Sequence, residues 1–376
     1  MAGLASDIEV EGRAQGAGVP AFSAALSRAM AALAAQGAAP AHLTGFVWSG
    51  PDPAALHPAR REVDRAWREV CAGFRAPVKV AFSSGHEVIV RAIASVPEAA
   101  PSSDPVFRGY GAAELARQMS PRGQVPDMGA LFAQWTRDGD AARAQHRALD
   151  IAYGAHRDEI FDLYRPEGLA RPPVWVFIHG GYWQASTKDQ HAQFCSGMLD
   201  AGFAVANIDY PLAPETPLRE IVAHVRAALH FIVREADALG VDASRLHVAG
   251  HSAGGHLAAY LAADPKAPPL ASAHILSGVV DLESLFHIPM GRVLGLRSIE
   301  EARALSPIHM RLRVGTRIAV AVGGAESDEF RRQSIEIAQA WGAPPPLVVA
   351  GANHFSLLDG LVDGDLLAQA REVCSG

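Results

Sequence analysis

The sequence predicts an α/β protein in which a mostly parallel sheet carries helices on both faces, preceded by a smaller α+β domain. The chain has 376 residues, more than one ordinary hydrophobic core requires, so two domains are expected. From residue 173 onward, short apolar segments alternate with helical ones, an order typical of parallel sheets. The segment 174–178 (VWVFI) is apolar throughout, which suits a strand buried on both faces.

Composition narrows the class of protein. Hydrophobic residues make up 49% and charged residues 19%, which is typical of globular rather than disordered chains. The net charge of −7 and the lack of a long basic run argue against nucleic acid as a partner. The three cysteines are too scattered for a disulfide framework or a metal knuckle. Residues 1–12 lack the apolar core of a signal peptide, and no apolar stretch reaches the length of a membrane span. We therefore expect a cytoplasmic protein with no membrane partner.

The N-terminal hundred residues predict an α+β unit. Residues 1–20 are rich in glycine and alanine, so we expect them to be loose at the start. The predicted elements are a helix over 22–36, a strand over 43–49, a helix over 60–74, and two strands over 78–82 and 87–94. The last two strands are separated only by residues 83–86 and are expected to form a hairpin.

This order of elements, with the segments ALSRAMAALAAQGA and EVIVRAIASV, resembles the Rid-type family of enamine/imine deaminases over residues 20–97. The family has an arginine after Pro-Ala where this chain reads Arg75-Ala76-Pro77. It also has a glutamate before its Ala-Ile-Ala end, where this chain has Arg91. We therefore expect domain 1–97 to be non-catalytic, serving as a scaffold or for homo-oligomerisation.

Residues 96–105 (VPEAAPSSDP) predict a linker, and we expect the second domain over residues 98–376. It opens with two short helices within 112–136, expected to cover a pocket, and with a β-hairpin over 150–164. The remaining predicted strands cover 174–178, 203–208, 246–249, 273–279, 317–322 and 346–349, with a long helix over 218–239 and a closing helix over 365–373.

The most informative motif for chemistry is Gly250-His251-Ser252-Ala253-Gly254, between the strand 246–249 and a helix rich in small residues. Strand, G-x-S-x-G and helix is the context of a nucleophile elbow, in which a serine occupies a strained turn. Glycines two residues before and two after keep neighbouring side chains clear of that turn. The helix N-terminus beside it favours negative charge. Ser252 is therefore a candidate nucleophile, the alternative being an idle serine in a glycine-rich turn.

The strand 174–178 leads directly into His179-Gly180-Gly181-Tyr182-Trp183. An acyl-transfer enzyme needs N–H donors for the oxyanion of its tetrahedral intermediate. A glycine loop after an early strand supplies one donor, and the residue after the nucleophile supplies another. We expect these donors to be the backbone N–H groups of Gly180, Gly181 and Ala253.

A serine nucleophile needs a histidine base and an acid that orients it, in the chain order serine, acid, histidine. Among the histidines after Ser252, His354 lies in a loop after the last predicted strand, where this architecture presents its base. The acid should follow the strand 317–322. Glu326, Asp328 and Glu329 are all possible by position, although acids at a helix start often only complement the dipole.

The motifs HGGYW, GHSAGGH, acid-Ser-x-Glu-Phe and Asn-His-Phe resemble the arylformamidase (kynurenine formamidase) branch of the α/β-hydrolases. The likeness extends from about Phe107 to the C-terminus and includes YGAHRDEIFDLY and DYPLAPE. It implies the α/β-hydrolase fold, with Ser252 as nucleophile, His354 as base and Glu326 as acid. It also implies hydrolysis of N-formylkynurenine to kynurenine and formate without a metal. The family commonly has Asp at the position of Glu326 and Pro at that of Asp328.

Together these features predict a serine hydrolase that cleaves an aryl-formamide or similar small amide through an acyl-enzyme. Tyr182, Trp183 and Phe355 flank the motifs and are expected to wall a pocket for an aromatic group. No cofactor or metal is expected, because no H-E-x-x-H or comparable cluster is present. One alternative is a carboxylesterase with the same triad. Another is a binding or assembly protein with a dead site, against which the complete serine, acid and histidine set argues.

Overall fold

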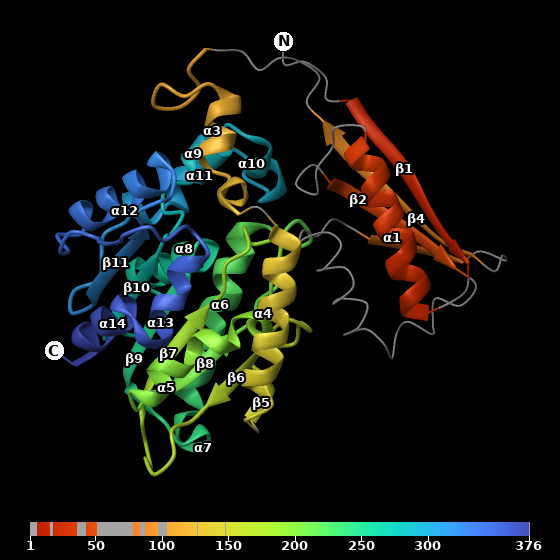
Figure 1. Ribbon diagram of the computed structural model, residues 1–376. Coiled ribbons are helices and arrows are strands. Elements are labelled where there is room, and N and C mark those ends of the chain that lie inside the picture. The colour runs from red at the N-terminus through yellow and green to blue at the C-terminus, as the bar shows by residue number, and fades with distance from the viewer. Residues whose placement is uncertain are drawn as a thin grey trace. The chain divides into compact units, whose positions relative to one another are not determined.

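The computed structural model describes residues 6–15, 18–35, 43–50, 78–82, 87–96 and 104–375, apart from Pro126 and Arg147. The chain separates into two compact units (Figure 1). The first consists mainly of residues 1–101, with the short segments 127–133 and 184–186, and the second contains the remaining residues. The predicted helix over 60–74 and most of the predicted linker lie outside the described residues.

The first unit contains a four-stranded sheet in the order β1-β4-β2-β3 and one long helix. Its elements are β1 (Ser6–Gln15), α1 (Gly18–Ala35), β2 (Leu43–Gly50), β3 (Val78–Phe82) and β4 (Glu87–Val96). Val10 and Ala14 of β1 and Val90 of β4 are buried, whereas Arg13 and Arg91 on the alternate positions are exposed. Helix α1 packs so closely on β1 that a side chain at Gly12 would collide with the backbone of Ala25.

Two predictions for this unit are wrong. Residues 6–15 form β1, the antiparallel partner of β4, whereas we expected the chain to be loose there. The alternation that marks a strand is weak because small residues, Gly12 and Ala14, occupy its inner face. Strands β3 and β4 also form no hairpin, because β2 lies between them, pairing in parallel with β3 and antiparallel with β4.

The second unit contains an eight-stranded sheet in the order β12-β11-β10-β9-β7-β8-β6-β5. Neighbouring strands from β12 to β8 are parallel, and β6 and β5 form an antiparallel hairpin at one edge. The strands are β5 (Ala148–Ala152), β6 (Ile160–Tyr164), β7 (Pro173–Ile178), β8 (Ala204–Ile208), β9 (Asp242–His251), β10 (Ser272–Leu276), β11 (Arg317–Gly323) and β12 (Leu347–Val349). This sheet confirms the predicted mostly parallel α/β architecture.

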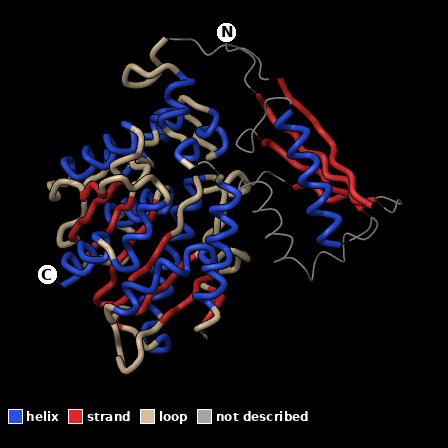
Figure 2. The backbone as a smooth tube through the Cα atoms, in the orientation of Figure 1, coloured by secondary structure: helices blue, strands red, loops and turns tan. Residues whose placement is uncertain are grey.

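Helices cover both faces of this sheet (Figure 2). On one face, α5 (Ser196–Asp200) contacts α14 (Asp365–Ser375). On the other face, α8 (Ala253–Ala263) contacts α6 (Leu218–Arg234), and α12 (Asp328–Ala340) packs on β11. The shorter helices are α3 (Ala112–Gln118), α7 (Ala236–Leu239), α9 (Glu283–Phe286), α10 (Pro289–Val293), α11 (Ile299–Ala304) and α13 (Gly360–Asp363); α4 (Met128–Arg143) extends beyond its predicted end. No helix in the described part of the chain is both long enough and apolar enough to cross a bilayer.

Two element boundaries differ from the prediction. The long helix expected over 218–239 ends at Arg234, and a separate turn, α7, closes at Gly240 in the left-handed conformation with φ 65°. The strand expected over 273–279 ends at Leu276, because Ser277 has φ 47° and turns the chain out of the sheet.

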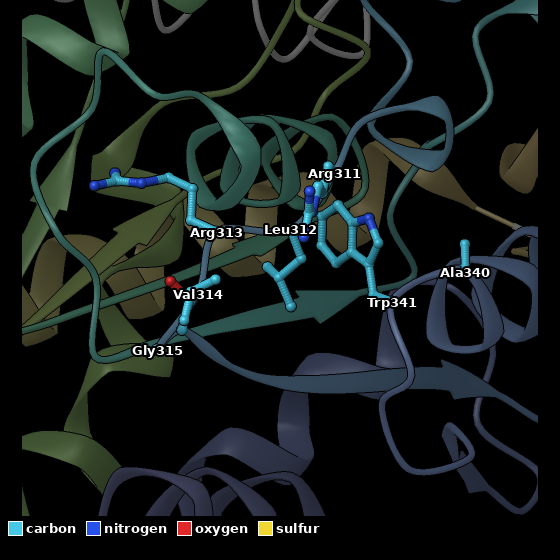
Figure 3. A pocket seen from close by; sticks show the side chains of 8 residues that line it. Arg311, Leu312, Arg313, Val314, Gly315, Ala340 and Trp341 are labelled. Carbon is cyan, nitrogen blue, oxygen red and sulfur yellow. The ribbon is translucent and has the colours of Figure 1, made fainter.

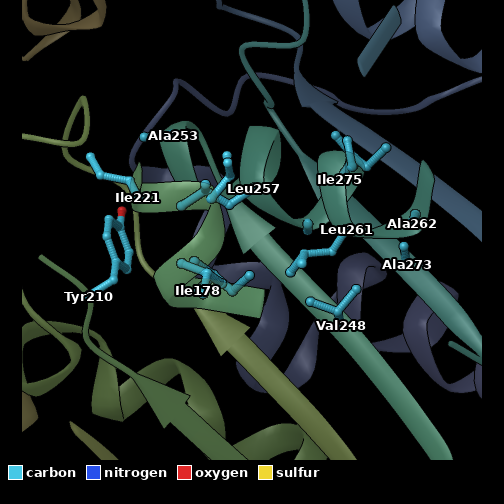
Figure 4. Close-up of a cluster of buried hydrophobic side chains, with 14 of the residues drawn as sticks. Ile178, Tyr210, Ile221, Val248, Ala253, Leu257, Leu261, Ala262, Ala273 and Ile275 are labelled. Carbon is cyan, nitrogen blue, oxygen red and sulfur yellow. The ribbon is translucent and has the colours of Figure 1, made fainter. Parts of the chain in front are cut away.

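The core of this unit lies between the sheet and α8 (Figure 4). Ile178, Val248 and Ile275, on the neighbouring strands β7, β9 and β10, are completely buried beside Leu257 and Leu261 of α8. All of VWVFI in β7 is buried, as its continuous apolar pattern predicts.

The strand order determines where loops can meet. From β7 the chain first adds β8 on one side and then returns to add β9 on the other. In such sheets a crevice opens at the carboxyl ends of the two strands that flank the reversal. The loops that follow β7 and β9 therefore border the same crevice.

Candidate active site

Ser252 occupies the sharp turn between β9 and α8, with φ 57° and ψ −115°. This conformation is strained for a residue with a side chain, and strained residues cluster at functional sites. A side chain at Gly250 would collide with the backbone of Gly254, and one at Gly254 would collide with the end of β7. The glycines of the G-x-S-x-G motif are therefore required by the close approach of backbone to backbone.

Glu326 and His354 form a buried acid–base pair. Glu326 follows β11 and His354 follows β12, and His354 Nδ1 lies 2.6 Å from Glu326 Oε2. The other carboxylate oxygen accepts hydrogen bonds from the Gly323 N–H at 2.7 Å and from the Ser277 hydroxyl. Because Nδ1 faces a carboxylate, it carries the proton, and Nε2 is left to act as an acceptor.

The electrostatics favour an ionised Glu326. Burial alone would raise the pKa of Glu326, but the charge and hydrogen bond of His354 lower it. The hydrogen bonds from Ser277 and the Gly323 N–H add to this effect, so that the pKa lies below its ordinary value. The site thus holds a carboxylate able to stabilise a neighbouring imidazolium.

The other two candidate acids point elsewhere. Asp328 begins α12, its side chain is 68% exposed, and it pairs with Arg331. Glu329 is buried but is paired with Arg332. The position of these two residues at the helix start therefore fits the simpler interpretation of helix-start charges.

His251, in the turn that carries Ser252, forms a hydrogen bond with the loop that carries His354. Its Nε2 donates to the His354 backbone oxygen at 2.8 Å, and the two ring centroids are 4.6 Å apart. Burial, reinforced by the charge of His354, holds the pKa of His251 well below its usual range, so the ring remains neutral. The residue before Ser252 is thereby bonded to the backbone of the candidate base.

The glycine loop after β7 runs against the elbow. A Cβ added to Gly180 would lie 2.9 Å from the His251 backbone oxygen and 3.1 Å from Ser252 Cβ. Gly181 has φ 109°, in the region that favours glycine. Ala253 begins α8, where backbone N–H groups have no partner within the helix. The loop and the helix start therefore flank Ser252, where we expected the donors from Gly180, Gly181 and Ala253.

The three aromatic residues expected at the pocket have different surroundings. The Tyr182 hydroxyl donates to the Met119 backbone oxygen, and Tyr182 is partly buried. The Phe355 ring lies 5.4 Å from the His354 ring, centroid to centroid. Trp183 is 0% exposed and its ring meets His256 edge-on, which places it in the core rather than on a pocket wall.

The short helix α3 ends beside these loops. Tyr182 bonds to Met119, directly after α3, and Ser327 donates to the Gln118 backbone oxygen at 2.6 Å. The segment that contains α3 is thus bonded both to the glycine loop after β7 and to the loop that carries Glu326. Its role as a cover over a pocket stays a prediction.

In addition to the Ser252 turn, the described residues contain a pocket and a cluster of potential metal ligands. A pocket of about 330 Å³ is lined by residues 311–316 with Ala340 and Trp341 (Figure 3). It lies before the start of β11, at the opposite end of that strand from Glu326. In the described part of the chain, Asp281, Glu283 and His309 are close enough to share a metal ion, with ligand atoms within 4.8 Å of one another. Two of these groups are already paired with arginine, Asp281 with Arg332 at 2.9 Å and Glu283 with Arg303 at 3.4 Å.

Sequence reasoning missed the groups that support the triad. Ser277 bonds to Glu326 from the end of β10, a contact between residues 49 positions apart that no local pattern indicates. His251 occupies a variable position of the G-x-S-x-G motif, so the motif itself says nothing about its role.

The sheet, the strained Ser252 elbow and the loops at the strand ends define an α/β-hydrolase, and the chain belongs to this family. The BD-FAE family model matches residues 161–273, which include Ser252. A protein from Silicibacter sp. TM1040, solved as a candidate thioesterase, is 30% identical with a TM-score of 0.61, over 67% of this chain and 97% of that one.

Further relatives of the chain are hydrolases of amides and esters. The kynurenine formamidase of Danio rerio is 29% identical over 265 residues, which cover 66% of this chain and 89% of the relative. The carboxylic ester hydrolase LipN of Mycobacterium tuberculosis is 41% identical over 98 residues, 26% of either chain. This protein is an arylformamidase-like α/β-hydrolase and a serine hydrolase of small amides or esters, as its motifs predict.

Proposed function

We propose that this enzyme cleaves an aryl-formamide, of which N-formylkynurenine is the model, by an acyl-enzyme mechanism. The 2.6 Å pair of Glu326 with His354, together with the strained conformation of Ser252, is the observation that carries the proposal. The similarity to a kynurenine formamidase over two thirds of the chain supports the choice of an amide substrate.

In this mechanism His354 Nε2 takes the proton of the Ser252 hydroxyl as its oxygen attacks the formyl carbonyl. The N–H groups of Gly180, Gly181 and Ala253 stabilise the resulting oxyanion. Glu326 holds the imidazolium until it passes the proton to the departing arylamine. Water, activated by the same histidine, then hydrolyses the formyl-serine ester and releases formate.

A comparison of substrates tests the proposal. We expect kcat/KM for N-formylkynurenine to exceed that for p-nitrophenyl acetate once both are corrected for their uncatalysed rates. A clear preference for the ester would instead favour a carboxylesterase, the function suggested by the likeness to LipN around the elbow. A fluorophosphonate probe that failed to label Ser252 would point to a dead site.

We propose that the N-terminal unit is a scaffold or oligomerisation element, and that the enzyme acts in the cytoplasm, where thiols such as those of Cys195 and Cys374 stay reduced. A truncated chain beginning at Asp104 should keep most of its hydrolase activity per site but change its oligomeric state, because every proposed catalytic residue lies after residue 104. Activity assays and light scattering would check this. Imine deamination by residues 1–97 alone would contradict the scaffold role.

A further inference from the structure

Two buried side chains form hydrogen bonds with the oxyanion loop, residues 179–183, which carries two of the proposed oxyanion donors. The Tyr210 hydroxyl donates to the His179 backbone oxygen at 2.9 Å. The His179 Nδ1–H donates to the Gly180 backbone oxygen at 2.7 Å. Tyr210 and His179 are both almost completely buried. Two successive carbonyl groups of the loop are therefore bonded by buried side chains.

These bonds determine the direction of the N–H groups. A trans peptide is planar, and its C=O and N–H point in opposite directions. The carbonyl of His179 shares a plane with the N–H of Gly180, and the carbonyl of Gly180 shares the next plane with the N–H of Gly181. Because both carbonyls are bonded, both N–H groups have set directions, and these are two of the proposed oxyanion donors.

The ring of His179 is itself held in place. It stacks on Tyr210 with centroids 4.5 Å apart and planes 13° apart, and on His191 at 5.7 Å and 29°. Its Nε2 lies 3.2 Å from Asp209 Oδ1, an ion-pair distance without the alignment of a good hydrogen bond. The same carboxylate oxygen accepts the Lys188 backbone N–H at 2.7 Å.

Nδ1 of His179 faces a carbonyl oxygen, which can only accept, so Nδ1 carries a proton. Burial alone would raise the pKa of Asp209, but the hydrogen bond and charge of His179 and the charge of Lys188 outweigh it and lower that pKa. Burial, with the charge of Asp209, raises the pKa of Tyr210 well above its usual range, so its hydroxyl keeps its proton. The Tyr210 hydroxyl and the His179 Nδ1–H are thus the donors that face the two carbonyl groups.

A hydrogen bond to a peptide carbonyl also polarises that peptide. Hydrogen bonds in a chain strengthen one another in a buried setting. The bond from His179 Nδ1 to the Gly180 carbonyl therefore makes the Gly181 N–H a stronger donor as well as orienting it.

We propose that Tyr210 and His179 are positioning residues that aim the oxyanion N–H groups of Gly180 and Gly181, and that Asp209, 3.2 Å from His179 Nε2, helps to hold the His179 ring in place. The proposal rests on the function proposed above for these N–H groups. Tyr210 directly follows Asp209 after β8, the neighbour of β7, and it belongs to the same buried cluster as Ile178, the last residue of β7 (Figure 4).

The test compares two matched tyrosine variants. Tyr210→Phe removes the hydroxyl from the oxyanion loop but leaves the ring. Tyr153→Phe removes the hydroxyl of another buried tyrosine, which donates at 2.8 Å to a different backbone oxygen, that of Asp209. We expect Tyr210→Phe to lower kcat/KM for p-nitrophenyl acetate about tenfold, below the 10²- to 10³-fold cost of losing an oxyanion donor outright. We expect Tyr153→Phe to lower kcat/KM by less than about twofold, although its Tm should fall about as much as that of Tyr210→Phe.

Phenylboronic acid supplies a second readout, because its tetrahedral adduct with serine places an oxygen in the oxyanion hole. We expect its inhibition constant to rise in Tyr210→Phe by the same factor as kcat/KM falls. In Tyr153→Phe the inhibition constant should stay unchanged. If Tyr210→Phe only loosened the packing, Tm would fall, but the inhibition constant would not rise by the factor by which kcat/KM falls.

A pair of histidine variants tests the second bond and covers the case in which Tyr210→Phe does not fold. The amide nitrogen of His179→Asn can replace Nδ1 as donor to Gly180, whereas His179→Leu offers no donor. The asparagine variant should keep at least about tenfold more kcat/KM than the leucine variant.

The outcomes distinguish failure of the positioning role from failure of the hydrolase function. Equal effects of the two tyrosine variants on boronate inhibition, or equal activity of the two histidine variants, would overturn the positioning role while leaving the hydrolase function intact. Wild-type protein that hydrolysed neither the ester nor the formamide would overturn the proposed function, and the positioning role with it.

Discussion

Ser252→Ala should lower kcat for both formamide and ester substrates by on the order of 10⁴-fold or more and leave the fold intact. The substitution removes the attacking oxygen and nothing else that holds the turn, because the bonds of Ser252 to Leu276 and His256 are made by its backbone. Alanine also has a Cβ, so the backbone strain at φ 57° is the same in both proteins. Steady-state kinetics and thermal unfolding would measure the two effects.

A matched control is available in α12. Ser334 is as buried as Ser252, and its hydroxyl has no hydrogen-bond partner among the residues that the structure describes. Ser334→Ala should therefore change kcat by less than about twofold. If Ser252→Ala retained activity within about tenfold of the wild type, the elbow would not carry the nucleophile.

The parts of the site predicted from sequence are those that depend on local backbone requirements. The elbow needs Gly250 and Gly254 because their backbones approach others too closely for a side chain. The glycine loop and the His354 loop each follow a strand whose apolar pattern predicts it, so their place at one sheet edge follows from the parallel order.

The remaining parts depend on contacts between distant residues. Glu326 and Asp328 are only two positions apart in the sequence. The turn after β11 buries Glu326 against His354 and leaves Asp328 exposed at the start of α12, and this difference cannot be seen from the sequence alone. The bonds of Ser277 and Tyr210 join residues in the loops that follow different strands. The predicted β3–β4 hairpin failed for the same reason, since β2, more than twenty residues upstream of β3, takes the place between them.

The effect of Glu326→Gln on kcat tests which acid orients His354. Glu326→Gln should lower kcat by roughly 10² to 10⁴ while preserving the shape of the site. The glutamine oxygen can still accept from Ser277 and the Gly323 N–H, but its amide NH₂ then faces His354 Nδ1. Nδ1 becomes an acceptor, the proton moves to Nε2, and the base can no longer accept the serine proton.

Asp328→Asn is the matched control, since it removes a carboxylate two residues away whose side chain is mostly exposed. An exposed charge at a helix start is worth about 1 kcal/mol at most, so this variant should lose less than about tenfold in kcat. Measuring kcat for both variants at the same pH separates the two roles. If Asp328→Asn lost more activity than Glu326→Gln, Asp328 would be the triad acid, and the 2.6 Å contact of Glu326 with His354 would not be the catalytic one.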